Sequence, residues 1–180
     1  RKIRPHNDEA QLILAADGSG ASIALALVQT LTEELRQKIK SIVLISPWID
    51  MNPQSEFLVN RIDYDGVLST ETLLRCGKYY TDEENLKKPL ISPLYVESFN
   101  LKSFPPVYIQ CGGDEILLDG VKAFKSKLEE NNIPCILDIW PEMMFLFQMA
   151  HERLPQAHLA SQRIGLYIQN LNKSLEQETE

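Results

Sequence analysis

The hydrophobic and polar positions of this chain alternate between two kinds of segment. Four short apolar runs, each bounded by turn residues, predict buried β-strands at Leu12–Ala15, Ile42–Ser46, Val107–Cys111 and Cys135–Ile139. In other segments apolar residues recur every three or four positions, which is typical of amphipathic helices. Strands that alternate with helices predict an α/β fold, a mainly parallel sheet flanked by helices. In such a sheet the chemistry lies at the carboxyl ends of the strands.

Three helices are predicted from their apolar stripes. The stripes are Ala24, Val28, Leu31 and Leu35 in the first helix, Val121, Phe124 and Leu128 in the second, and Ala157, Ala160, Ile164, Tyr167 and Leu171 in the third. Ile23 and Leu27 widen the first stripe, so we expect that helix to be mostly buried. The pair Asn131-Asn132, followed by Pro134, predicts the end of the second helix.

The length of 180 residues fits a single domain, 1–180. Between the second and third strands lies a long insert, 50–105, in which Thr70–Tyr80 is helix-like. A connection of this length is usually functional or structured in its own right. The polar tail, 173–180, is expected to be frayed.

Composition excludes several function classes. The net charge of -7 comes from 25 acidic and 18 basic residues without a Lys/Arg cluster, so no nucleic acid partner is expected. No apolar run reaches the roughly 20 residues of a membrane span, and the N-terminus lacks a signal-peptide layout, so a cytoplasmic location is expected. The spacing of Cys76, Cys111 and Cys135 favours neither a metal site nor a disulfide. No cofactor is expected.

Four segments, in order, carry a resemblance to one family. The segment 12–26 contains Ala16-Asp17-Gly18-Ser19-Gly20 and is similar to the nucleophile elbow, G-D-S-A-G-G, of the hormone-sensitive-lipase family of esterases and lipases. Ser46-Pro47-Trp48-Ile49-Asp50 resembles the family's S-P-W-x-D, and Ser92-Pro93-Leu94-Tyr95 its S-P-L-x. The segment 105–119, which includes Gly112-Gly113-Asp114, resembles P-P-x-x-I-x-x-G-x-D-x-L-x-D.

The resemblance implies an α/β-hydrolase fold whose N-terminal strands are absent from this chain. It also implies an ancestral reaction, the hydrolysis of a carboxylic ester by a Ser-His-Asp triad. In the family, the first strand of this chain pairs with an element that precedes it. We therefore expect a longer parent polypeptide, and an exposed sheet edge that the missing N-terminal half or a second copy covers.

When the family's triad is compared with this sequence residue by residue, one of its three residues is matched and two are not. Asp114 matches the acid. The nucleophile position is Gly18, which has no side chain, and Ser19 follows it as an oxyanion N–H donor or a displaced nucleophile. Asp17 and Gly20 flank the turn and are candidate binding positions. The loop Glu142–Gln148 corresponds to the family's E-G-M-x-H-x-F-Q, but it is one residue short and has no histidine.

Each candidate also has a structural interpretation. Ser19 is expected to cap the first helix, and Asp114 could cap the turn before Asp119. His151 lies about 7 Å beyond Leu146 along an α-helix, which is too far for proton transfer. His158 falls on the last helix, and His6 falls before the first strand. The apolar residues Met143, Met144, Phe145, Phe147 and Met149 are expected to serve core packing rather than an acyl pocket.

The sequence therefore leads to three hypotheses. The first is a catalytically inactive esterase homologue, a pseudoenzyme without metal or cofactor. The second is a carboxylic ester hydrolase that uses Ser19 together with an unseen N-terminal half. The third is a pseudo-esterase that binds a small-molecule ester or acyl ligand without turning it over.

Overall fold

The sheet contains four parallel strands in the order β1-β2-β3-β4. The computed structural model describes residues 11–59, 65–97 and 103–178. The strands are β1 (Leu12–Asp17), β2 (Ile39–Ile45), β3 (Val107–Gly112) and β4 (Cys135–Trp140). One row of the register runs from Leu14 to Ile42, Val107 and Cys135. The four predicted strands, their parallel pairing and their adjacency are confirmed.

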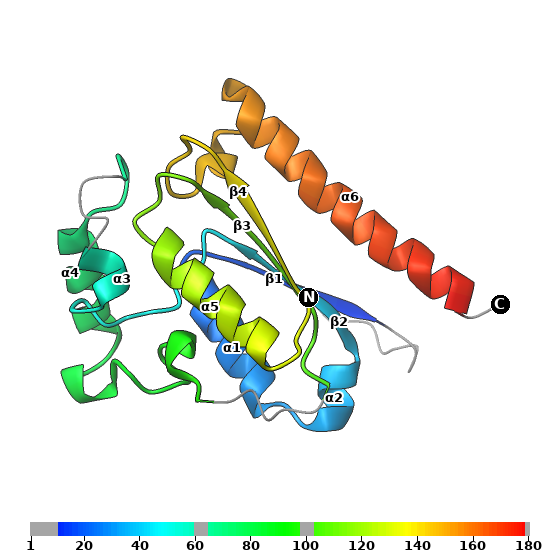
Figure 1. Cartoon of the computed structure of the whole chain (residues 1–180), viewed down its shortest axis with the longest axis horizontal. Helices are drawn as coiled ribbons and strands as arrows, with labels where there is room; N and C mark the ends of the chain where they lie inside the picture. Colours follow the sequence, from blue (N-terminus) through cyan, green and yellow to red (C-terminus); the bar gives the residue numbers. More distant parts are fainter. Residues whose placement is uncertain (1–10, 60–64, 98–102, 179–180) are drawn as a thin grey trace, which may run out of the picture.

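Helices cover both faces of the sheet. The helices are α1 (Gly20–Thr30), α2 (Glu33–Gln37), α3 (Glu56–Val59), α4 (Thr70–Tyr80), α5 (Leu118–Glu130) and α6 (Pro155–Glu178), with 3-10 turns η1 (Glu83–Asn85), η2 (Pro93–Tyr95) and η3 (Phe147–Arg153). Helices α1 and α5 lie on one face and α6 crosses the other, while α3 and α4 lie to one side (Figure 1). Among the described helices, none has both the length and the apolarity of a membrane span.

The main core lies between the sheet and the pair α1 and α5. Leu25 and Val28 of α1, Phe124 and Leu128 of α5 and Ile109 of β3 are all fully buried there. The stripe predicted for α5 is therefore confirmed. The helix ends at Glu130 with Asn131 as its C-cap, and Asn132 adopts a φ of 58°, a left-handed conformation that asparagine tolerates.

The buried stripe predicted for the first helix is partly wrong. Ile23 and Leu27 are 59% and 46% exposed, because they lie on the side of α1 that faces away from the sheet. Leu35 lies on α2, a separate helix, because Leu31 is extended (φ -68°, ψ 150°) and ends α1. The spacing of apolar residues at three and four positions thus predicted the helix correctly, but it predicted a wider buried face than the helix has.

The described parts of the insert contain helices α3 and α4 and the 3-10 turns η1 and η2. Helix α4 spans the predicted Thr70–Tyr80, and the hydroxyl of Ser69 caps it by accepting a hydrogen bond from the Thr72 N–H at 3.2 Å. At the other end of the chain the structure continues α6 to Glu178, whereas the sequence predicts a frayed tail from residue 173.

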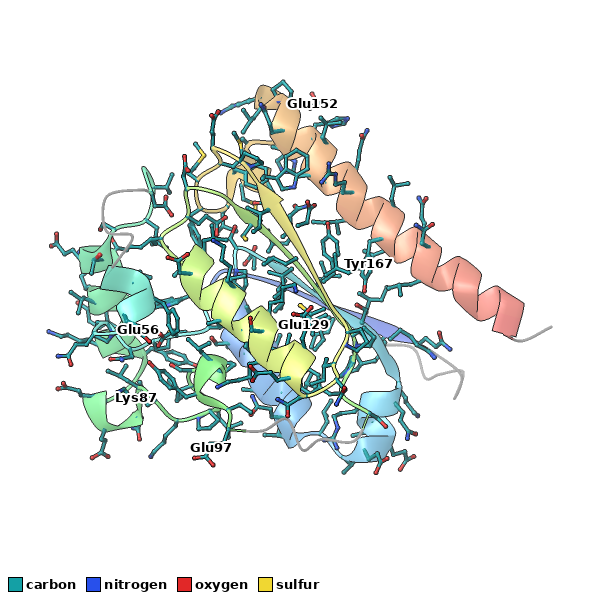
Figure 2. The ribbon with its side chains drawn as sticks, in the orientation of Figure 1. Glu56, Lys87, Glu97, Glu129, Glu152 and Tyr167 are labelled. Atoms are coloured by element: carbon teal, nitrogen blue, oxygen red, sulfur yellow. The ribbon has the colours of Figure 1, made fainter. Side chains whose placement is uncertain are left out.

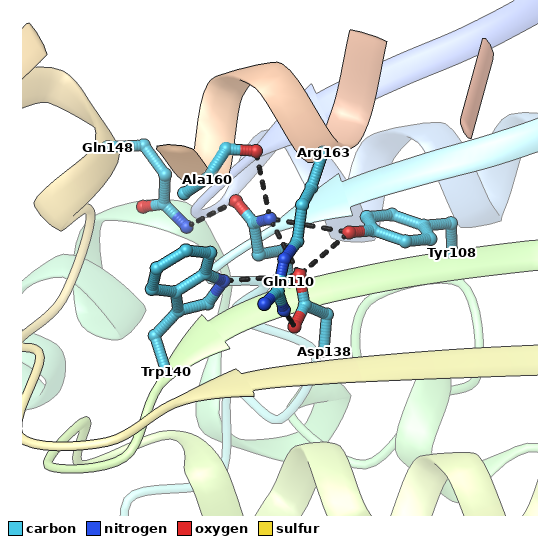
Figure 3. A network of polar contacts seen from close by, with 7 residues as sticks. All are labelled: Tyr108, Gln110, Asp138, Trp140, Gln148, Ala160 and Arg163. Carbon is cyan, nitrogen blue, oxygen red and sulfur yellow. Dashed lines mark hydrogen bonds and ion pairs between the residues drawn. The ribbon is translucent and has the colours of Figure 1, made fainter. Parts of the chain in front are cut away.

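A polar network joins α6 to the sheet. Tyr167 points from α6 toward the strands (Figure 2), stacks on Tyr108 at 4.6 Å and lies 2.7 Å from the Ser41 hydroxyl. Asp138 on β4 lies at the centre of the network drawn in Figure 3. Its carboxylate accepts hydrogen bonds from Tyr108 (2.9 Å), Gln110 (3.0 Å), Trp140 (3.1 Å) and Arg163 (2.7 Å). These bonds connect two strands to the long helix.

Candidate active site

The turn between β1 and α1 has the strand–turn–helix geometry of a nucleophile elbow. Gly18 adopts a φ of +44°, which glycine accepts without the steric cost that an L side chain meets. Its N–H donates to the Ile45 carbonyl at 3.0 Å, and its own carbonyl accepts from the Trp48 N–H at 2.9 Å. The turn is thereby held against the end of β2.

The nucleophile position faces an aromatic ring. A Cβ built on Gly18 would lie 3.4 Å from Cζ of Phe145. Phe145 belongs to the loop Glu142–Gln148, in which the family carries its histidine. The turn at Gly18 and the loop Glu142–Gln148 therefore approach each other at the Phe145 ring.

Ser19 is at the N-terminus of α1, where it is solvent-exposed. Its hydroxyl makes no capping hydrogen bond, so the predicted capping role is wrong. The reason is that Ser19 itself has helical angles (φ -68°, ψ -22°), whereas a capping side chain needs an extended backbone. Asp17 is exposed at the end of β1, and a Cβ on Gly20 would make an ordinary contact with Ala16 at 3.8 Å.

Asp114 follows β3 by two residues and is half-buried. Its backbone N–H donates to the Met143 carbonyl at 3.0 Å, while its carboxylate receives no hydrogen bond from any described residue. Helix α5 begins after Leu117 without a side-chain cap, so the alternative capping role is wrong as well. Gly18 and Asp114 lie at the same end of the sheet, after two strands that both flank β2, as the sequence predicts.

The loop Glu142–Gln148 rests directly on the end of β3. A Cβ on Gly112 would lie 2.0 Å from the Met143 carbonyl oxygen and 3.0 Å from that of Met144. Only glycine fits there, because any side chain would displace the loop backbone. Gly112 therefore allows the loop to approach the acid and nucleophile positions.

The Asp65 carboxylate and the Ser46 hydroxyl bind two successive backbone N–H groups of this loop. Asp65, from the insert, accepts a hydrogen bond from the Phe145 N–H at 3.5 Å and another from the Ile116 N–H at 3.2 Å. The Ser46 hydroxyl accepts from the Leu146 N–H at 3.1 Å and donates to Glu115 at 2.5 Å. The position of the Phe145 ring is thus set by the backbone on both sides of it.

These anchoring residues were not predicted from the sequence. Ser46, which the sequence places at the end of the second predicted strand and in the S-P-W-x-D segment, has a φ of 45° and is completely buried. Glu115 is fully buried and also accepts a hydrogen bond from the Gly112 N–H at 2.6 Å. Asp65 precedes Gly66, and this dipeptide by itself indicates a turn and not an anchor.

The described histidines lie elsewhere. His151 is exposed within η3, and its backbone angles (φ 49°, ψ -126°) interrupt the helical path from Leu146 that the distance estimate assumed. His158 is exposed on α6, where its ring lies 2.9 Å from the Gln162 amide. His6 lies outside the described residues.

The His151 conformation gives a direct stability prediction. Because a non-glycine residue with positive φ costs about 1–2 kcal/mol, His151→Gly is expected to raise the free energy of unfolding by about 1 kcal/mol. His158→Gly, within helix α6, should lower it by about the same amount. Chemical denaturation of the two variants measures both shifts. A loss of stability in His151→Gly would show that the histidine side chain makes a contribution larger than its backbone strain.

The apolar residues of the loop do not act as one group. Phe147 is buried against Trp140, with ring centroids 5.8 Å apart, and Met143 packs on the same cluster. Met144 and Met149 are largely exposed, so the expected core packing is wrong for these two residues. Phe145 packs instead on a second cluster that includes Trp48, between the sheet and the insert.

The site contains neither a metal cluster nor a reactive thiol within the described residues. In that part of the chain no three His, Cys, Asp or Glu side chains converge as metal ligands. Cys111 is buried, and burial raises the pKa of the Cys135 thiol to about 11, which keeps it protonated at neutral pH.

The parallel sheet, the elbow turn and the acid after the third strand define an α/β-hydrolase. The chain belongs to the alpha/beta hydrolase fold family, whose sequence pattern matches residues 2–149.

Curated relatives include a bacterial esterase and a bacterial acetyl-hydrolase. An esterase of Acinetobacter venetianus is 32% identical over 162 residues, which are 89% of this chain and 52% of that protein. An acetyl-hydrolase of Streptomyces hygroscopicus is 28% identical over 158 residues, 88% of this chain and 52% of that protein. The chain thus spans about half the length of the curated relatives that it matches.

Solved structures show the same relationship. An esterase from the bacterial hormone-sensitive lipase family matches with a TM-score of 0.78 and 27% identity, over 91% of this chain and 54% of that structure. A hormone-sensitive lipase from a metagenome library matches with a TM-score of 0.79 and 26% identity, over 88% and 53%. The chain is an α/β-hydrolase that resembles the esterases of this family.

Proposed function

We propose that this chain is a pseudoenzyme, an esterase-type homologue that does not hydrolyse esters. The observation that carries the proposal is that Gly18 faces the Phe145 ring, whose Cζ would lie 3.4 Å from a Cβ built on Gly18. A serine esterase needs a nucleophilic oxygen and, within about 3 Å of it, a base that accepts the proton. Both positions are occupied here by groups that cannot exchange a proton.

A second candidate is a carboxylic ester hydrolase that uses Ser19 together with further polypeptide. The free, exposed hydroxyl of Ser19 favours this candidate, because no capping bond restrains it. Against it, Ser19 follows the turn by one residue, and among the described residues no histidine lies against the turn. A serine without a base is a poor nucleophile at neutral pH.

The wild-type chain is expected to show no hydrolysis of p-nitrophenyl acetate or butyrate above the rate in buffer. A fluorophosphonate probe, which labels activated serines, is expected to leave the chain unlabelled. An active serine esterase treated in parallel provides the positive control, and Ser19→Ala the matched variant. Stoichiometric labelling that disappears in Ser19→Ala would refute the pseudoenzyme and support the second candidate.

A third candidate is a pseudo-esterase that binds an ester or acyl ligand at the elbow. The exposed side chains of Met144, on the loop that carries Phe145, and of Met149, in η3 directly after that loop, favour it. Saturable binding of butyrate esters without turnover, weakened by Phe145→Ala, would distinguish this candidate from a scaffold without a ligand.

A further inference from the structure

A cavity of about 410 Å³ opens in the insert. Its walls come from the segment after β2, from α4 and from the turn at η1, all of which are described. The floor is apolar: Met51 and Leu86 are buried in the cluster around Trp48, and Leu74 of α4 forms one side. The volume lies within the roughly 300–1,000 Å³ that is usual for small-molecule sites.

The walls approach each other closely, so the cavity is preformed. Gly77 of α4 faces the Met51 carbonyl, and a Cβ at this position would lie 3.4 Å from that oxygen. Gly77 is itself buried. The close approach fixes α4 against the segment after β2, so the floor does not need to be assembled by a ligand.

Four polar side chains from three segments surround this apolar floor: Gln54, Lys78, Thr81 and Glu83. Within the described part of the chain, none of the four side chains donates or accepts a hydrogen bond, and none forms an ion pair. Their hydrogen-bonding groups are therefore available to a ligand. A site that orients a small amphiphilic molecule usually has an apolar surface with a few polar groups around it.

The charges at the rim select against a charged ligand. The lining residues carry one ammonium, on Lys78, and one carboxylate, on Glu83. An anion is attracted by Lys78 but repelled by Glu83, and the reverse holds for a cation, so neither sign of charge is favoured. Gln54 and Thr81 offer both donors and acceptors to an uncharged group.

We propose that this cavity binds a small uncharged amphiphile, with its aliphatic part on Met51, Leu74 and Leu86 and its hydroxyl, amide or ester group toward Gln54 and Thr81. The site is separate from the elbow and does not depend on the pseudoenzyme proposal. If the cavity proposal fails, the pseudoenzyme proposal is unaffected, and the reverse also holds.

The test is a titration of the full chain, ¹³C-labelled at its Met and Leu methyl groups, with 1-hexanol. Saturable shifts are expected at Met51, Leu74 and Leu86, with a dissociation constant of the order of 1 mM. Leu74→Trp, which fills the cavity, should weaken binding at least about tenfold. Tyr79→Trp is the matched control, because Tyr79 lies on the same helix, is 85% exposed and does not line the cavity.

Charged analogues test the ligand class. Hexanoate and hexylammonium should each bind at least about threefold more weakly than 1-hexanol. Tighter binding of hexanoate that is lost in Lys78→Gln would overturn the uncharged class. Absence of saturable shifts at the three floor residues up to the solubility limit, or equal binding by Leu74→Trp, would overturn the site itself. Unfolding curves of both tryptophan variants establish that they are folded.

Discussion

The double variant Gly18→Ser with Phe145→His is expected to hydrolyse p-nitrophenyl butyrate at least about tenfold faster than the wild-type chain, whereas neither single change produces hydrolysis. The structure places residue 145 directly against the nucleophile position, with Phe145 Cζ 3.4 Å from a Cβ on Gly18. The two anchored amides of the loop, at Phe145 and Leu146, should hold a histidine in the same place. Phe145→His therefore supplies the base by substitution, although the loop is one residue shorter than the family's.

The magnitude follows from the cooperation of the triad. A general base raises the reaction rate about 10²–10⁴-fold in evolved enzymes. The surroundings of residue 145 have not evolved to orient a histidine, so we expect a rate increase at or below the lower end of that range. Gly18→Ser alone lacks the base, and Phe145→His alone lacks the nucleophile, so neither single variant should hydrolyse the ester faster than the wild-type chain. Asp114→Asn in the double variant should reduce the rate again if the acid orients the new histidine.

Initial rates between pH 5 and pH 9 provide the measurement, with Ser19→Ala in the double variant as the control for the neighbouring hydroxyl. The rate should rise with pH, with an apparent pKa of about 6.5, as expected for a histidine base. Activity in Gly18→Ser alone with that pH dependence would show that another histidine reaches the turn. The account of a site without a base would then be wrong.

Gly18→Ser should also lower stability. The left-handed φ of +44° costs an L residue about 1–2 kcal/mol, and thermal unfolding of the single variant measures this loss separately from activity. This control shows whether an inactive variant is folded.

Asp138→Ala is expected to reduce the free energy of unfolding by about 3 kcal/mol. The substitution removes one acceptor that four donors share, and it leaves the buried groups of Tyr108, Gln110 and Trp140 without that partner. Urea denaturation measures the loss, and Arg163→Ala, which removes only the 59% exposed partner, should cost clearly less.

The pH dependence of this loss has a defined sign. Burial alone would raise the pKa of Asp138, but hydrogen bonds from Gln110, Tyr108 and Trp140 and the charge of Arg163 hold that pKa below its ordinary value of 3.8. The stabilisation is therefore complete above about pH 4 and is lost as the pH falls through the pKa of the folded state. The difference between wild type and Asp138→Ala should shrink in acid.

Asp50 is the matched control, because its shift has the opposite direction. Burial raises the pKa of Asp50, only partly offset by hydrogen bonds from Ser55, Asn52 and Tyr95 and by the charge of Lys87. Its ionised form thus opposes folding as the pH rises, so Asp50→Asn should cost less than about 1 kcal/mol at pH 7. A large loss in Asp50→Asn and none in Asp138→Ala would contradict both assignments.

The sequence by itself determined the sheet and the edge of the sheet at which the site lies. Strands such as Val107–Gly112 and the helix Thr70–Tyr80 follow from local periodicity and turn residues, which act over a few positions. Gly18 and Asp114 each follow a predicted strand, and parallel strands end at one edge, so their shared location needed no further information.

Tertiary structure alone decided what fills the site and which helix surface is buried. Ile23 fits the apolar spacing of α1 yet is exposed, because burial depends on where the sheet lies and not on the period alone. The contact of Phe145 with Gly18 joins residues far apart in the chain, and it depends on anchors from the insert and from the ends of β2 and β3. The sequence pattern of one segment does not indicate which loops come into contact, because those contacts depend on how all the helices, strands and loops pack together.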